Sequence, residues 1–452
     1  MTAGRRVAWG PAVVNGARVL SPIEVLRAEC ATLTVRLAAA ERARDVALAR
    51  AEDTESSLRS VRSSRDQAER DVEALRARVA EFAAAPKSSA TKAPAKARKV
   101  DGFTFAAAVR LVKPIVETRP TLPILGTVRI SSADGRAVVE ATDRTTFVRL
   151  ATSDEYTGPA LAVDPRLLAK AKGALRAGDR STLDVGGAGL PALDGADYPD
   201  APALDLPMST VHIPADALAA ALRRMVHAIA PDDYRYGLNG ALVETNAHDR
   251  TTRFVATDGN RLAYATLAGV EWALPRKFLL PRKTAELLAT ILAKLGSEPV
   301  VVTTYDYAVR LACGPFVLVA RLLEADFPDY RQVLPTTFKR RATLDRDELA
   351  AELKRILPFT DSGNFTVTFD FGGESVGLQA RTVEKGECRG SVPCNFAWDN
   401  LRIGFNARLM LESLAAMPVG TVTLDMGDTL APCQLVGTDA GNLDVIMPIR
   451  LD

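Results

Sequence analysis

Hydrophobic positions in the first part of the chain recur with alternating spacings of four and three, the pattern of a heptad repeat. The repeat runs from residue 26 to residue 82, and no Gly or Pro interrupts residues 23–85. Ser21-Pro22-Ile23-Glu24 supplies a helix N-cap, a Pro at the first helical position and a capping-box Glu. The pattern predicts a coiled-coil helix over residues 21–82, about 85–90 Å long, after a tail of residues 1–20. Because the middle of the repeat is rich in Arg, Ala and Thr, a solvated single helix is the alternative.

After residue 100 the pattern changes to short strand-like runs and amphipathic helices, and it recurs along the chain. A first helix is predicted at residues 105–116, 215–229 and 346–356, and a second at residues 165–175, 282–295 and 407–417. Strand-like runs lie between and after these helices, at residues 136–142, 253–256, 300–304, 316–322, 365–371 and 421–426.

Short motifs repeat within this second part of the chain. Ala141-Thr142-Asp143 returns as Ala256-Thr257-Asp258, and Ala196-Asp197-Tyr198-Pro199-Asp200 returns as Ala325-Asp326-Phe327-Pro328-Asp329. A period of about 120 residues indicates tandem domains of one fold rather than a solenoid. We therefore predict an α+β fold of three domains, each with two helices against an antiparallel sheet. The predicted domains are residues 101–208, 209–335 and 336–452.

Composition and charge refine this division. Residues 1–100 carry 19 Lys and Arg against 12 Asp and Glu, whereas the remaining residues carry 38 against 43. Residues 83–100 are mostly Ala, Lys, Pro and Ser, which predicts a flexible basic linker. No apolar run approaches the length of about 20 residues that a membrane span needs. Five scattered cysteines and the lack of a secretion signal favour a reducing cytoplasm.

The residues that usually carry catalysis are sparse and unfavourably spaced. The three histidines and five cysteines show no metal-ligand spacing, and there is no nucleophile elbow and no phosphate-binding loop. Asp143 and Asp258 follow predicted strands, where Asp more often makes turns than paired acid–base groups. We therefore expect a protein without enzymatic activity, cofactor or metal.

Basic residues on the predicted helices suggest binding instead. Cations accompany small residues there, including Lys170, Lys172, Arg223 and Arg224. On an acidic body they could form a surface for a phosphate backbone, without base specificity. For any one of them, a solvated helix face is the simpler interpretation.

Five motifs in order make the sequence more specific. They are Arg119-Pro120-Thr121-Leu122-Pro123-Ile124-Leu125, Tyr234-Arg235-Tyr236-Gly237-Leu238-Asn239-Gly240, Ala256-Thr257-Asp258-Gly259-Asn260-Arg261-Leu262-Ala263, Phe327-Pro328-Asp329-Tyr330-Arg331-Gln332-Val333-Leu334-Pro335 and the terminal Met447-Pro448-Ile449-Arg450-Leu451. Over residues 101–452 the chain resembles the bacterial DNA polymerase III β subunit, the sliding clamp. The N-terminal arm lies outside this resemblance.

The resemblance implies a head-to-tail ring of two chains around duplex DNA, held topologically. It also implies a mainly apolar groove for the Leu and Phe anchors of short linear motifs in a DNA polymerase and a clamp loader. In this interpretation residues 443–446 form a strand and residues 447–451 wall the groove. The implied peptide-binding residues are Leu238, Thr257, Gly259, Arg261, Leu262, Pro328, Val333, Asn406, Val445, Met447, Pro448, Ile449, Arg450 and Leu451.

For DNA the resemblance implies contacts from Arg119 and Tyr236. The family commonly has a second aromatic residue directly after Tyr236, where this chain has Gly237. The largest departure lies in the first domain, which is shorter by roughly one hairpin after residue 185. Those strands ordinarily form the edge that pairs with the next chain, so ring closure is open.

Two functions follow from these features. The first is a processivity clamp that encircles DNA and tethers the replicative polymerase. The alternative is a clamp-derived interaction module without a ring, assembled through the N-terminal coiled coil. An enzyme in its own right is the least favoured, since no nucleotidyl-transfer site is visible.

Overall fold

The computed structural model describes residues 103–178, 181–245, 251–267, 277–335, 337–439 and 441–451, together with residues 13, 14, 17, 18, 34, 41, 270, 272 and 274. Apart from the six described residues before residue 100, the predicted tail, coiled-coil helix and basic linker lie outside this set, as does Asp452. Near the N-terminus, β1 (Val13–Val14) and β2 (Ala17–Arg18) form a short hairpin.

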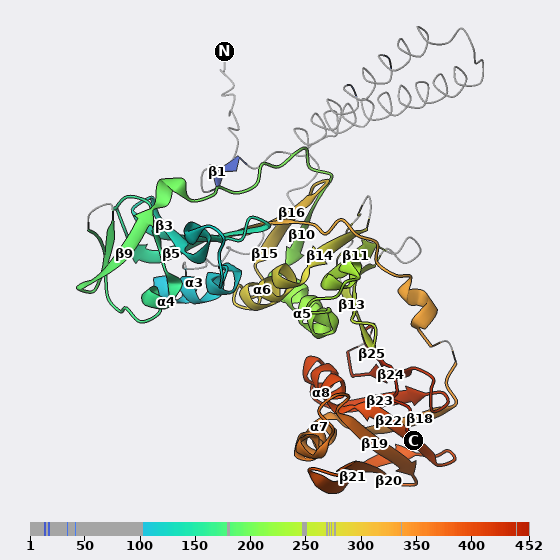
Figure 1. Ribbon diagram of the computed structural model, residues 1–452. Helices are drawn as coiled ribbons and strands as arrows, with labels where there is room; N and C mark the ends of the chain where they lie inside the picture. The colour runs from blue at the N-terminus through green and yellow to red at the C-terminus, as the bar shows by residue number, and fades with distance from the viewer. Residues whose placement is uncertain are drawn as a thin grey trace, which may run out of the picture. The chain divides into compact units, whose positions relative to one another are not determined.

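Two large sheets, whose named strands all pair antiparallel, make up most of the body (Figure 1). The first has the order β10 (Ser209–Pro214), β15 (Pro299–Thr304), β16 (Ala308–Cys313), β17 (Phe316–Arg321), β5 (Thr146–Glu155), β4 (Arg136–Thr142), β3 (Val128–Ala133), β6 (Leu161–Val163), β9 (Ala188–Asp194), β8 (Thr182–Val185) and β7 (Leu175–Ala177). The second has the order β14 (Phe278–Pro281), β11 (Gly240–Thr245), β12 (Thr252–Thr257), β13 (Arg261–Leu267), β25 (Leu443–Ile446), β24 (Cys433–Val436), β23 (Thr421–Met426), β18 (Arg340–Asp345), β21 (Gly386–Phe396), β20 (Ser375–Thr382), β19 (Thr366–Gly372) and β22 (Leu401–Asn406).

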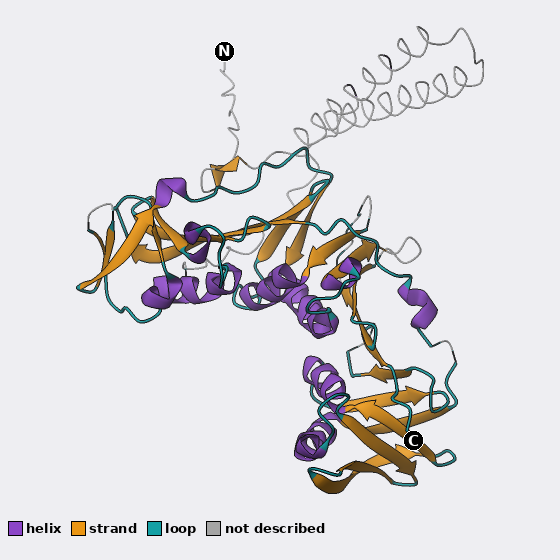
Figure 2. Cartoon of the chain, in the orientation of Figure 1, coloured by secondary structure: helices purple, strands orange, loops and turns teal. Residues whose placement is uncertain are grey.

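Helices lie against these sheets at all six predicted places (Figure 2). They are α3 (Phe105–Val112), α4 (Pro165–Leu168), α5 (Ala215–Met225), α6 (Arg282–Leu292), α7 (Arg346–Ile356) and α8 (Ala407–Ala416). The α+β clamp-type arrangement of antiparallel sheets and few helices is thus confirmed. The division into three domains remains a prediction.

Most of the helices end earlier than the hydrophobic pattern predicts: α5 stops at Met225 and α6 at Leu292, and α3 and α4 also fall short. α3 stops at Val112, and a 3-10 turn takes over at Lys113–Ile115, because Pro114 lacks the amide that would continue the helix. The prediction of a helix over residues 165–175 is wrong beyond Leu168. There the chain turns through Gly173, whose φ is +127°, into strand β7. A left-handed φ of this kind suits glycine and ends a helix.

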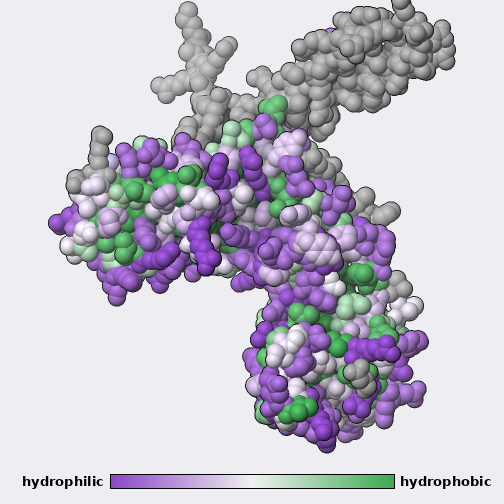
Figure 3. All heavy atoms as spheres, in the orientation of Figure 1, coloured by the Kyte–Doolittle hydropathy of each residue, from purple (hydrophilic) through white to green (hydrophobic). Residues whose placement is uncertain are grey.

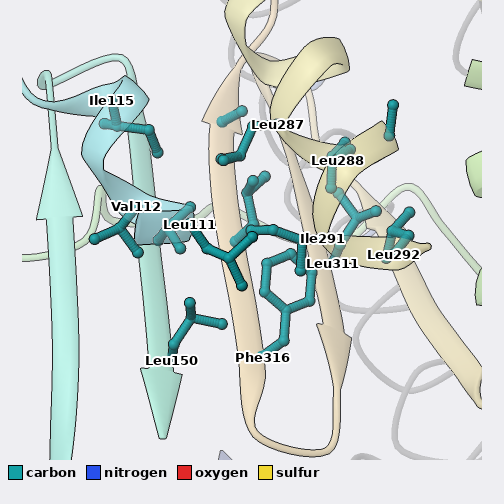
Figure 4. Packing of buried hydrophobic residues seen from close by; sticks show 14 of the residues in the cluster. Leu111, Val112, Ile115, Leu150, Leu287, Leu288, Ile291, Leu292, Leu311 and Phe316 are labelled. Atoms are coloured by element: carbon teal, nitrogen blue, oxygen red, sulfur yellow. The ribbon is translucent and has the colours of Figure 1, made fainter. Parts of the chain in front are cut away.

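A single hydrophobic core joins the predicted first and second domains. Strand β5 pairs with β17, for example Leu150 with Phe316, so the first sheet is continuous across residue 208. Buried side chains from α3, α6 and these strands interlock in one cluster (Figure 4). Residues 342–446 contribute a second cluster, rich in Phe.

The outer end of the first sheet is made of short strands. Strand β7 has three residues and β8 has four, and the β8–β9 turn is made by Gly186 and Gly187, both with positive φ. This end therefore offers few backbone groups for pairing with another chain.

The visible face of the described residues is mostly hydrophilic, with hydrophobic atoms in small groups (Figure 3). Among the helices in the described ranges, none is both long and apolar enough to span a membrane.

Candidate functional site

The C-terminal strand β25 is paired on both sides. Leu262 of β13 lies opposite Val445, and Cys433 of β24 lies opposite Ile446. The strand predicted at residues 443–446 is therefore confirmed, and it joins β13 to the sheet strands that follow residue 340. The Met447 amide extends this pairing, since it donates to the Asn260 carbonyl oxygen at 2.8 Å.

The tail beyond Met447 lies along strand β22. The Ile449 amide donates to the Gly404 carbonyl oxygen at 2.7 Å. Gly404 is needed for this approach, because an added Cβ would lie 2.7 Å from the Ile449 oxygen and 2.8 Å from a methyl carbon of Leu451. The structure thus brings Ile449 and Leu451 to the strand that ends at Asn406.

A separate apolar cluster lies beneath the paired strands β13 and β25. Its buried members are Leu242, Val255, Leu262, Leu279, Phe327, Tyr330 and Val445. Two of the predicted pocket residues, Leu262 and Val445, therefore belong to this one cluster, together with side chains of residues 327–330. We call the cluster the floor of the predicted pocket. Near that floor in sequence, Met447 is 38% exposed, Val333 is 46% exposed and Pro328 is also exposed. These apolar side chains remain accessible to a partner.

The turn between β12 and β13 is built by its own polar groups. Thr257 Oγ1 donates to the Arg261 carbonyl oxygen at 2.6 Å and accepts the Gly259 amide at 3.1 Å. Asp258 accepts the amides of Asn260 and Arg261. Asp143 accepts the amides of Thr145 and Thr146 in the same way. Both aspartates make turns, as predicted.

Three predicted pocket residues have structural tasks. The Arg261 guanidinium is buried, donates to Asp258 Oδ2 at 2.9 Å and lies 2.7 Å from Glu412 Oε2. Asn406 caps α8 by accepting the amides of Arg408 and Leu409. Leu238 is buried on the 3-10 turn Tyr236–Asn239. Pro448, Ile449 and Leu451 are half-buried, and Arg450 is exposed.

The predicted DNA-contacting residues divide into exposed and buried. Arg119, Lys170, Lys172 and Arg223 are exposed, and Tyr236 is 75% exposed. Lys170 and Lys172 follow α4 rather than lying on a helix, since α4 ends at Leu168. The glycine after Tyr236 has a packing reason, because a Cβ on Gly237 would lie 2.1 Å from the Asp326 carbonyl oxygen.

Arg224 is a correction to the predicted DNA surface. Only 3% of the residue is exposed, its Nε donates to Asp439 Oδ2 at 2.9 Å, and its Nη1 donates to Asp444. Its charge is neutralised inside the protein and is unavailable to a phosphate. The sequence could not distinguish Arg224 from its exposed neighbour Arg223, because both lie on the same predicted helix and the acidic partners of Arg224 lie more than 200 residues away.

His227 and Ser413 join this buried cluster, which the sequence reading missed. The His227 Nε2 lies 2.8 Å from Asp444 Oδ1 and 3.2 Å from Ser413 Oγ. A Ser-His-Asp hydrolase needs the serine and the acid on opposite ring nitrogens, whereas both lie on one nitrogen here. The one available signal was an Asp inside the apolar run Leu443–Ile446. Within the described residues, no group of three metal-ligating side chains occurs.

Comparison with known proteins gives a consistent result. Residues 212–329 match the central domain of the DNA polymerase III beta subunit, and residues 331–450 match its C-terminal domain. The beta sliding clamp of Chlamydia muridarum is 26% identical over 358 residues, covering 76% of this chain and 96% of the relative. That of Caulobacter vibrioides is 27% identical over 370 residues, covering 75% and 96%.

A solved sliding clamp, DNA polymerase III subunit beta from Pseudomonas aeruginosa bound to griselimycin, has a similar fold. Its TM-score is 0.68 at 25% identity, covering 77% of this chain and 97% of that one. The two domain matches together span slightly more than half of the chain, and the relatives are matched over nearly their full length. The chain therefore belongs to the DNA polymerase III beta subunit family, the beta sliding clamps.

Proposed function

We propose that this clamp closes into a head-to-tail ring of two chains around duplex DNA and tethers a DNA polymerase and a clamp loader through the C-terminal pocket. The observation that carries the proposal is the placement of β25. It is paired with β13 and β24, so residues 447–451 continue directly from a strand that contributes to the apolar floor.

The pocket suits short peptides with apolar anchors. Leu262 and Val445 provide a buried floor, whereas Met447, Val333 and Pro328 are exposed. A Met side chain adapts its shape to different partners. Polar groups that are already occupied, such as those of Arg261 and Asn406, hold the surrounding backbone in place.

On the DNA side, exposed Arg119, Tyr236, Arg223, Lys170 and Lys172 would contact the duplex. Cations that touch only phosphates carry no sequence information, which suits a ring that slides. The clamp is an accessory protein without catalysis of its own, and we propose that it acts in the cytoplasm.

Griselimycin is bound in the solved clamp from Pseudomonas aeruginosa, and we propose that in this chain it occupies the C-terminal pocket, so its binding tests the pocket. We expect the chain to bind this compound, and the double variant Met447→Ala with Leu451→Ala to weaken binding by about 2–4 kcal/mol, the usual loss for anchor residues. Calorimetry measures the affinity, and thermal unfolding should change little because Met447 is partly exposed. Val383→Ala, at a fully exposed position, is the control. Equal affinity in the double variant would refute the pocket assignment.

The short edge strands β7 and β8 favour one alternative, a clamp-derived module that is assembled through its N-terminal arm instead of a ring. Deleting residues 1–100 separates the two. A ring-forming clamp stays oligomeric in size-exclusion chromatography with light scattering, because its contacts lie in the body. A fall to monomers would support the module.

A further inference from the structure

A buried charged cluster ties the C-terminal end of α5 to the C-terminal strand. Arg224 binds Asp439 and Asp444, and His227, in the 3-10 turn after α5, binds Asp444 and Ser413. Asp444 and Ser413 are fully buried. The cluster therefore links residues 224–227 to residues 413–444 through side chains alone.

A gain in folding stability does not explain why the chain buries this cluster. Taking charges out of water costs free energy that their attraction only partly returns, and well-packed apolar groups often replace such pairs without loss. Three buried polar atoms of this cluster, Arg224 Nη2, His227 Nδ1 and Asp439 Oδ1, have no hydrogen-bond partner among the described residues. Buried ionic groups of this kind are best known for fixing register.

In this protein the buried ionic groups fix the register of β25 against β13. Successive side chains of a strand point to opposite faces, so a slip by one residue would exchange Asp444 with Val445. At present Asp444 meets Arg224, while Val445 packs with Leu262 in the pocket floor. A strand held at Asp444 therefore also presents Val445 and Met447 on the pocket side.

The same turn holds the neighbouring strand. The His227 carbonyl oxygen accepts Arg261 Nη2 at the start of β13, while the His227 ring binds Asp444 of β25. Residues 224–227 thus bind both β13 and β25, the two strands that meet at the pocket floor. A cavity of about 820 Å³, lined in part by Arg224, His227 and Asp439, lies beside this cluster.

We propose that Arg224 is a positioning residue for the peptide pocket: with Asp444 and His227 it holds β25 in register on β13, so that the C-terminal segment is preformed for binding. This proposal rests on the proposed function. It assigns to Arg224 a part in peptide recognition rather than in DNA contact.

The test compares griselimycin binding by Arg224→Met, which keeps the length of the side chain but removes its charge, with Arg224→Lys, which keeps the charge. We expect Arg224→Met to weaken griselimycin binding by about tenfold or more, since removing the cation of a buried ion pair destabilises the strand that carries the acid. We expect Arg224→Lys to bind nearly as tightly as the unmodified chain. Arg389→Met, at an exposed ion pair with Glu387, is the control. The proposal fails if both Arg224→Met and Arg224→Lys bind griselimycin as tightly as the unmodified chain. It also fails if the two variants bind griselimycin equally weakly.

Hydrogen exchange of the peptide spanning residues 443–451 gives a second readout. Faster exchange in Arg224→Met but not in Arg224→Lys supports the proposal, and unchanged exchange contradicts it. If the unmodified chain does not bind griselimycin, the pocket assignment fails, and exchange alone then decides the positioning role. If Arg224→Met does not fold, Asp439→Asn takes its place: faster exchange at residues 443–451 supports the proposal, and unchanged exchange overturns it.

Discussion

Among single residues, Tyr198 shows how a repeated motif serves different ends in its two copies. The Tyr198 hydroxyl donates to the Thr127 carbonyl oxygen and accepts the Thr142 amide, both at 3.1 Å. Its counterpart in the second copy, Phe327, has no hydroxyl and packs in the apolar cluster that contains Leu262 and Val445. The same sequence position therefore supports a hydrogen-bond junction in one copy and an apolar cluster in the other.

Burial raises the pKa of Tyr198 to about 12 from its ordinary value of 10. The neutral phenol is thus favoured in the folded state, and its contribution to stability is complete below pH 10. As pH rises from 10 to 12, the unfolded chain releases this proton first, so stability should fall. Denaturant unfolding across this range measures the fall. In Tyr198→Phe the free energy of unfolding should fall less steeply with pH between pH 10 and 12. An equally steep fall would contradict the raised pKa of Tyr198.

The sequence identifies residues that act locally better than residues that act at a distance. The turns made by Asp143 and Asp258 depend on amides two and three residues away, and both were predicted. The role of Arg224 depends on Asp439 and Asp444. Because such partners meet only after folding, the basic residue could not be separated from its exposed neighbour Arg223.

At the level of elements, helix positions follow from the hydrophobic pattern and helix ends follow from local chemistry. The helix at residues 346–356 agrees with prediction at both ends, since Asp345 caps its first amides. The second helix of the first repeat does not, because the chain must turn at Gly173 to form β7. The period alone could not show that this copy is cut short.

The shared core across residue 208 leads to a stability prediction. Phe316 of β17 is fully buried and lies among side chains of β5, β16 and α6 (Figure 4). Phe316→Ala should lower the free energy of unfolding by about 3–5 kcal/mol, as large cavities do. It should also destabilise residues 103–200 and 209–322 together, in one hydrogen-exchange transition. Loss of protection in only one of these segments would show separate cores.

For the molecule as a whole, the sequence supplied the family and the order of the motifs, but not how the sheets continue across the repeats. Strand β5 pairs with β17, and β13 pairs with β25, in each case joining residues of different predicted domains. A repeat period cannot predict such pairings, because it treats each copy as a domain whose strands pair only with one another. The second of these pairings places Val445 beside Leu262, in the apolar cluster on which the proposed pocket rests.

Retention on circular DNA tests the central claim, a closed ring, most directly. After loading by a clamp loader onto nicked circular plasmid, the clamp should stay with the DNA through gel filtration, because a closed ring can leave only over an end. Cutting the circle once should release it within the time of the filtration. Loss from intact circles as fast as from linear DNA would contradict the account.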